Sequence, residues 1–261
     1  MKRFRNICVY TALLFGLSGC LNHAGHYNFS DPTSVIHLDE ELNEISGLHL
    51  INDSTIACVQ DEKGTIYHLN PTSNSIVSEI PFHRKGDYEG IAHYQNKYYV
   101  LQSNGTILII GKNGVEKKVE FDGCKDSDFE GLCLDIKHDR LLVACKESCK
   151  KKDEDNILVY SFLIHKKKYK KNEVYRLKKK DIHKNFKSSG IAVHPNGNIY
   201  LLSSFAKTLA IVSKTGDILD VHSLSSYIFH QPEGITFSRN GDLYISNERN
   251  TGKPSLMKLN Y

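Results

Sequence analysis

Five times along the chain, a serine or a glutamate stands directly before a glycine and an aliphatic residue. The residues at this position are Ser46, Glu89, Glu130, Ser189 and Glu233. Asp87 and Asp128 each lie two residues before one of these glutamates, on the same face of an extended strand. Carboxylate oxygens are ligands of hard cations, and calcium takes roughly six to eight oxygen ligands. The predicted calcium ligands are Asp87, Glu89, Asp128, Glu130 and Glu233, and Ser46 and Ser189 are predicted to line the same channel.

The negative charges of these carboxylates restrict the states in which they can lie close together. Carboxylates that lie close together repel one another, so they must take up protons or bind a cation. The alternative interpretation is that these residues cap strands and accept hydrogen bonds from backbone amides. The sequence contains neither the His-Glu-x-x-His pattern of zinc hydrolases nor the Gly-x-Ser-x-Gly nucleophile motif.

Side chains this far apart in sequence meet only if repeated units place them around one axis. The repeated glycines are separated by 43, 41, 59 and 44 residues, at Gly47, Gly90, Gly131, Gly190 and Gly234. Spacings of about 40 to 45 residues are typical of one four-stranded propeller blade. The longest spacing contains a lysine-rich insertion between Cys149 and Lys187.

Each repeat also has the pattern of several short strands. After the glycine comes a short apolar strand such as 91–94, then a turn, then a stronger run such as 98–101. Asn196-Gly197 and Asn240-Gly241 stand between two such runs, a strong hairpin signal. Four strands per repeat make one propeller blade.

The two ends of the chain predict how the ring closes. The last repeat, from Gly234 to Tyr261, has room for three strands, and residues 35–38 supply a fourth strand ahead of the first glycine. An N-terminal strand that completes the last blade leaves no long exposed edge. The predicted fold is therefore an all-β, five-bladed β-propeller over residues 33–261, closed by its N-terminal strand.

The first twenty residues have the pattern of an export signal. Lys2, Arg3 and Arg5 precede an apolar run over 7–17, and Leu17-Ser18-Gly19-Cys20 resembles a lipobox. The run is too short to span a bilayer core of roughly 30 Å as a stable helix. We expect a lipoprotein signal peptide over 1–19, a lipid-modified Cys20 and a polar tether over 20–32. The alternative is an ordinary cleaved signal in which Cys20 has no role.

Several motifs of the repeats resemble the SdiA-regulated family of bacterial proteins. They are Phe129–Leu132, Ser188–Gly190, Gln231–Ile235 and Gly241–Ser246, and the similarity extends from about residue 34 to 259. The resemblance implies a five-bladed propeller, distantly related to NHL-repeat proteins, with a bound calcium ion. The lysine-rich insertion is the main departure from the family pattern.

These observations predict a lipoprotein of the cell envelope, held on a membrane through Cys20, with a weak preference for the outer membrane because Leu21 is not aspartate. The first hypothesis is a non-catalytic binding module that presents its loops to a protein or glycan. The second is a metal-dependent lactonase or esterase of the six-bladed SMP-30-like type, and whether the protein is an enzyme is left open. A net charge of +4 and predicted export argue against a nucleic-acid partner.

Cysteine usage leaves two alternatives open. Apart from Cys8 and Cys20, five cysteines remain: Cys58, Cys124, Cys133, Cys145 and Cys149. The blade model places Cys124 and Cys149 at the same face of the propeller, where an exported protein could form a disulfide. Unpaired buried thiols are the alternative.

Overall fold

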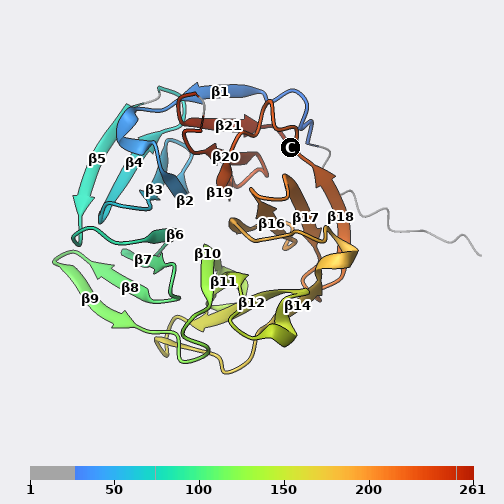
Figure 1. The fold of residues 1–261 in the computed structure, drawn as a ribbon. Coiled ribbons are helices and arrows are strands. Elements are labelled where there is room, and N and C mark those ends of the chain that lie inside the picture. Colours follow the sequence, from blue (N-terminus) through green and yellow to red (C-terminus); the bar gives the residue numbers. More distant parts are fainter. Residues whose placement is uncertain (1–26, 74, 251) are drawn as a thin grey trace, which may run out of the picture.

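The computed structural model describes residues 27–73, 75–250 and 252–261, and these form a ring of five antiparallel sheets around a central axis (Figure 1). The predicted signal peptide and Cys20 lie outside the described residues. The all-β, five-bladed propeller fold predicted from the repeats is confirmed. Within the described residues, helix is limited to short 3-10 turns: η1 (Glu40–Leu42), η2 (Ile136–His138), η3 (Lys151–Asp153) and η4 (Lys179–Asp181).

Each blade begins with an inner strand at the axis and proceeds outward. Blade 1 consists of β2 (Ile45–Asn52), β3 (Thr55–Gln60), β4 (Thr65–Asn70) and β5 (Ser75–Pro81). Blade 2 consists of β6 (Tyr88–Tyr94), β7 (Lys97–Gln102), β8 (Ile107–Gly111) and β9 (Gly114–Val119). Blade 4 consists of β15 (Gly190–Val193), β16 (Ile199–Ser203), β17 (Thr208–Val212) and β18 (Ile218–Ser223).

Blade 3 contains the lysine-rich insertion. Its strands are β10 (Asp128–Asp135), β11 (Arg140–Glu147), β12 (Asn156–Leu163), β13 (Lys168–Tyr169) and β14 (Tyr175–Lys178). Both β13 and β14 pair with β12, so the insertion divides the outermost strand in two. The added residues thus lengthen loops of one blade and do not add a blade.

Blade 5 joins the two ends of the chain. It consists of β19 (Pro232–Phe237), β20 (Leu243–Asn247), β21 (Ser255–Leu259) and the N-terminal strand β1 (Ser34–His37). β1 pairs antiparallel with β21, from Ser34 opposite Lys258 to His37 opposite Ser255. The prediction that an N-terminal strand closes the ring is confirmed.

The repeated glycines lie where the inner strands approach one another most closely. A Cβ atom on Gly90 would lie 2.6 Å from the Cβ atom of Leu132 on the next blade, and one on Gly47 would lie 2.7 Å from the Cα atom of Gly90. Gly131 also has a φ of +109°, which residues with side chains rarely adopt. The glycine of the repeat is therefore required by the contact between blades.

Packing between blades forms the core. The buried apolar side chains fall into five clusters, and each cluster lies between two neighbouring blades. Phe129 and Phe162 of blade 3, for example, pack with Leu101 and Ile107 of blade 2. Each blade is thus stabilised mainly by its neighbours, which makes closure of the ring important for every one of them.

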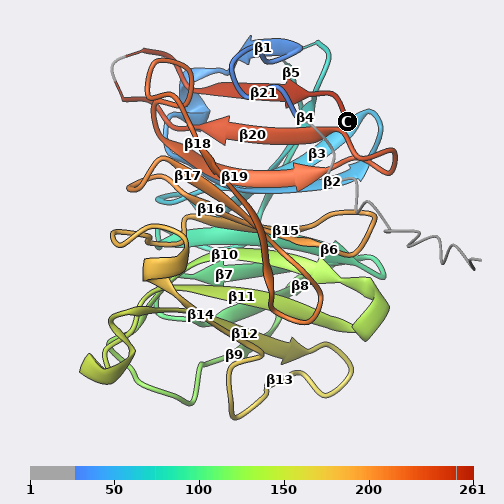
Figure 2. The ribbon, with the colours of Figure 1, turned by 90° about the vertical axis from the view of Figure 1, so that its right-hand side faces the viewer.

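The propeller has two faces, which we name by the inner strands. The start face is where β2, β6, β10, β15 and β19 begin, and the end face is where they end; Figure 2 shows these strands side on. Tyr27, 7% exposed, donates a hydrogen bond to the Gly241 carbonyl on the end face and packs against Phe237. Tyr27, the first described residue of the predicted tether, is therefore packed on the propeller. No helix of the described residues is long and apolar enough to cross a bilayer.

One disulfide fixes loops on the start face. Cys124, which precedes β10, is bonded to Cys149, which follows β11, with their Cα atoms 6.1 Å apart. Cys58, Cys133 and Cys145 are buried and unpaired among the described residues. Of the alternatives that the sequence left open, the structure thus contains the disulfide for one pair and buried thiols for the others.

Candidate functional site

The residues predicted to converge lie together at the start face, around the mouth of the central channel. Ser46, Glu89, Ser189 and Glu233 line a small cavity on the axis, together with four of the five repeated glycines. Each belongs to, or directly precedes, the inner strand of its blade, because the repeat places it at the same point of every blade. The fifth position, Glu130, is 9% exposed and interacts electrostatically with Glu89 and Glu233.

Burial and mutual repulsion raise the pKa values of these carboxyl groups. For Glu89, burial contributes most, followed by the charge of Glu130 and interactions with Asp87, and the pKa rises to about 10. Burial is also the largest cause of the raised pKa values of Glu130 and Glu233. The pKa of Asp128 is raised as well, again mainly by burial. The mouth of the channel therefore favours neutral carboxyl groups or a bound cation.

Two further acidic residues join the group from the second strands of their blades. Glu248 follows β20 and is 9% exposed; burial, and then the charges of Glu233 and Glu44, raise its pKa to about 9. Asp61 follows β3, and burial and the nearby acids raise its pKa to about 6. We define the carboxylate cluster as Asp61, Asp87, Glu89, Asp128, Glu130, Glu233 and Glu248.

Neither residue belongs to the repeated motif, which lies only on the inner strands, so neither was predicted from the sequence. In an antiparallel blade the second strand ends beside the start of the first, so the residue after that strand also reaches the channel mouth. Pro232 pairs with Asn247, which places Glu248 one residue beyond that pair. An acid directly after the second apolar run was the signal that could have identified them.

Lys146 supplies a positive charge within the cluster. Its ammonium group is bonded to Oε1 of Glu130 and lies 3.6 Å from Oδ2 of Asp128. Burial lowers the pKa of Lys146, but the hydrogen bond and charge of Glu130 outweigh this effect and raise it. Lys146 neutralises part of the cluster, and the charge of Lys207 also acts on Glu233. Among the described residues, Glu89, Glu233 and Glu248 form no ion pair within 4.0 Å.

The two serines have a different role from the glutamates. The Ser46 hydroxyl donates a hydrogen bond to the Tyr88 carbonyl of blade 2, at 2.6 Å. The Ser189 hydroxyl donates to the Pro232 carbonyl of blade 5, at 2.9 Å. Both serines line the channel as predicted, but their hydroxyl groups connect neighbouring blades.

The carboxylate cluster has the donor chemistry of a calcium site but not its final arrangement. Within the described residues, no three side chains of aspartate, glutamate, histidine or cysteine converge closely enough to hold a metal ion as they stand. The donors are carboxylate oxygen atoms, which suit a hard cation; Glu130 and Glu248 are buried, Asp87 is exposed, and the others are half-buried. Binding would require these flexible side chains to turn towards a common point, and Glu130 to share its contact with Lys146.

Large aromatic side chains are exposed on loops of the start face. Phe205, between β16 and β17, is 67% exposed, and Tyr227, before β19, is 90% exposed. The Lys187 ammonium lies 5.2 Å from the centre of the Phe205 ring. Exposed aromatic residues next to charged ones are typical of surfaces that bind a partner.

Comparison with protein families gives one match. A family model described as SdiA-regulated matches residues 34–251, which is nearly all of the propeller. No curated protein matches the chain.

Solved structures with similar folds include two enzymes and a WD40 propeller domain. A glutaminyl cyclase from Myxococcus xanthus has 15% identity and a TM-score of 0.61, with 88% of this chain and 94% of that chain covered. A luciferin-regenerating enzyme has 10% identity and a TM-score of 0.54, with 88% and 96% covered. The WD40 propeller domain of Doa1 has 10% identity and a TM-score of 0.53, with 87% and 96% covered. At these identities, the likeness shows the propeller fold alone.

Proposed function

The chain belongs to the SdiA-regulated family, and on this basis we propose that it is a lipid-anchored binding module of the cell envelope that binds calcium at the start face of its propeller. The observation that carries this proposal is the convergence of buried carboxyl groups at the channel mouth. The anchor would be Cys20, at the end of the lipobox-like sequence. The partner would be a protein or a glycan that contacts the loops of the start face.

The residues that would hold calcium are Glu89, Glu130 and Glu233, with Asp87 and Asp128 beside them. These residues come from blades 2, 3 and 5. A divalent cation would replace the repulsion among their carboxylates with attraction and would connect blade 5 to blades 2 and 3 across the channel.

The exposed aromatic residues support the assignment of a partner to this face. Phe205 and Tyr227 each expose a large ring on loops of the same face as the carboxylate cluster. Aromatic rings supply much of the contact energy in protein interfaces, and their flat faces also pack well against other rigid groups. A cation at the channel mouth would order the start-face loops that carry Phe205 and Tyr227.

A calcium titration tests the metal site. Calcium at about a hundred times its dissociation constant would stabilise the native state by about 2.7 kcal/mol, which raises the melting temperature by roughly 5 to 10 °C. The increase should be lost in the double variant Glu89→Gln and Glu233→Gln. It should persist in Glu116→Gln, because Glu116 pairs with Lys97 away from the channel mouth. A wild-type melting temperature that does not respond to millimolar calcium would contradict the proposal.

Fatty-acid labelling in cells tests the anchor separately. The full chain should incorporate labelled palmitate and fractionate with membranes, and Cys20→Ser should do neither. Incorporation that persists in Cys20→Ser would rule out this attachment point.

A second candidate is a metal-dependent lactonase or esterase. The raised pKa values of Glu130 and Glu233 favour it, because carboxyl groups that keep protons near neutral pH can act as general acids. Both the glutaminyl cyclase and the luciferin-regenerating enzyme show that enzymes use a similar fold. Hydrolysis of lactones or esters that needs calcium and is abolished by Glu130→Gln would favour this candidate over the non-catalytic module.

A further inference from the structure

A pocket of about 310 Å³ opens on the end face, on the opposite side of the molecule from the carboxylate cluster. Its lining comes from the end of β10, the loop between β15 and β16, and the end of β19, so three blades contribute to it. Tyr175 of β14 and Lys214, from the loop after β17, complete one wall. The pocket is continuous with the end face and shares no residue with the carboxylate cluster.

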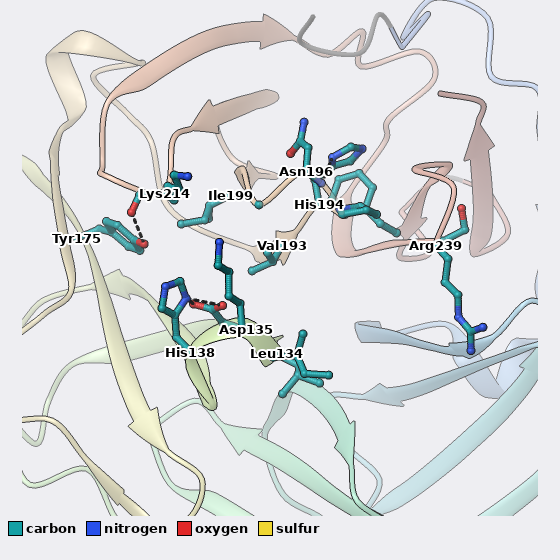
Figure 3. A pocket seen from close by; sticks show the side chains of 16 residues that line it. Leu134, Asp135, His138, Tyr175, Val193, His194, Asn196, Ile199, Lys214 and Arg239 are labelled. Carbon is teal, nitrogen blue, oxygen red and sulfur yellow. Dashed lines mark hydrogen bonds and ion pairs between the residues drawn. The ribbon is translucent and has the colours of Figure 1, made fainter. Parts of the chain in front are cut away.

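Apolar side chains form the floor of the pocket. Leu134, Val193, Ile199 and Phe237 line it, and in Figure 3 Ile199 and Val193 lie between Lys214 and Leu134. Ile136, at the rim, is 67% exposed, which is unusual for an isoleucine. An apolar floor that remains open to solvent is a favourable surface for the apolar part of a ligand.

The charged residues around this floor are mostly cationic and lack partners. No carboxylate of the described residues lies within 4.0 Å of the charged groups of Lys137, Lys214 or Arg239, all of which line the pocket. The carboxylate in the lining is Asp135. It is already bonded to Arg140, at 2.7 Å, and to His138, at 2.9 Å.

From this combination we propose that the pocket binds an organic anion with an apolar body, such as a carboxylate on an acyl chain. The apolar body would cover Leu134, Val193 and Ile199, and the anionic group would meet the Lys137 and Lys214 ammonium groups. Asp135 does not oppose the anion, because the Arg140 guanidinium and His138 imidazole already surround its carboxylate. The volume is at the lower end of the range of about 300 to 1,000 Å³ that is usual for pockets that bind small molecules.

A second basic cavity separates this proposal from simple charge attraction. Lys152, Lys178, Lys179, Lys180 and Lys184 line a groove of about 430 Å³ on blade 3, with Asp155 and Asn156 and with no apolar side chain. An anion that binds through charge alone would prefer this groove, because it has more lysines. A ligand that needs both charge and apolar contact would prefer the pocket on the end face.

Calorimetric titration with dodecanoate tests the proposal. Two control probes each lack one part of the proposed ligand: dodecanol has the apolar chain without the negative charge, and sulfate has the charge without the chain. Wild-type protein should bind dodecanoate at one site, dodecanol at least about tenfold more weakly, and sulfate not at that site. Lys214→Glu should weaken dodecanoate binding by about tenfold or more, since it reverses one of the charges that attract the anion. Lys180→Glu, in the lysine groove, is the matched control and should leave the affinity unchanged.

A pocket-filling variant gives an independent result. Val193→Trp should abolish dodecanoate binding, and its circular dichroism and melting temperature would show that the propeller is folded. Lys214→Glu keeps the test valid if Val193→Trp fails to fold, because Lys214 is on an exposed loop. The proposal would be overturned by dodecanoate binding that is absent in the wild type, equal to that of dodecanol, or weakened by Lys180→Glu but not by Lys214→Glu.

Discussion

At the scale of single residues, the carboxylate cluster is the central feature, and the sequence predicted only part of it. The repeated motif, a glutamate directly before a glycine, identified Glu89, Glu130 and Glu233, because a repeat must place equivalent residues at equivalent points of each blade. Lys146 and Glu248 could not be found in this way. They depend on how the second strand pairs with the first, a register that involves a bulge in blades 3 and 5.

Removal of the lysine in the cluster should destabilise the protein. Lys146→Met leaves Glu130 and Asp128 without their cationic partner, and because the Lys146 side chain is 32% exposed we expect a loss of about 1 to 2 kcal/mol. Urea unfolding at pH 8 with a chelator measures this loss. Calcium should restore more stability to Lys146→Met than to the wild type. Lys118→Met removes an exposed pair with Glu120 and should change stability by less than about 0.5 kcal/mol.

The pH dependence of stability follows from the raised pKa values. Folded Glu89 has a pKa of about 10, far above the value of an unfolded glutamate, so the native state retains a proton that the unfolded state releases. Without divalent cations, the free energy of unfolding should be highest near pH 5 and fall as the pH rises towards 9. Glu89→Gln should flatten this slope. A slope that Glu89→Gln leaves unchanged would show that Glu89 is not responsible.

At the scale of elements, the inner strands and their glycines determine how the blades meet. The spacing of the glycines was sufficient to predict the number of blades, and the strand count at the two ends of the chain was sufficient to predict the closing strand. The reason for the glycines could not be predicted from one sequence. It lies in the contact between neighbouring inner strands, where even one carbon atom would clash.

Substitution of one repeated glycine tests this contact. A Cβ atom on Gly90 would lie 2.6 Å from the Leu132 Cβ atom, so Gly90→Ala must push two blades apart, at a cost of about 1 to 3 kcal/mol. Thermal unfolding should show a clearly lower melting temperature. Gly252→Ala is the matched control, because a Cβ atom there would meet nothing within 4 Å. Equal melting temperatures for the two variants would contradict the explanation.

The disulfide of blade 3 should contribute to stability on its own. It joins residues separated by 25 positions, and a bond that closes a loop of this length contributes about 3 kcal/mol. A reductant should therefore lower the melting temperature of the wild type. The double variant Cys124→Ser and Cys149→Ser should start from the lower value and show no further change with reductant.

At the scale of the whole molecule, the two faces of the propeller carry different candidate sites. The start face has the carboxylate cluster, exposed aromatic residues and the lysine groove of blade 3. The pocket of the end face has cations around an apolar floor, with no carboxylate of the described residues within 4.0 Å of them. The first could be predicted in outline because it is built by a repeat. The second could not, because its residues belong to loops that differ from blade to blade and meet only in the folded ring.

The most direct test of the account is to locate a cation in crystals of the full propeller grown with calcium, by its anomalous scattering. We expect one ion at the start-face mouth of the channel, bound by oxygen atoms of Glu89 and Glu233 and at least one carboxylate of blade 3. Crystals that contain calcium only elsewhere, with Glu130 still bonded to Lys146 and the channel mouth free of cations, would contradict it.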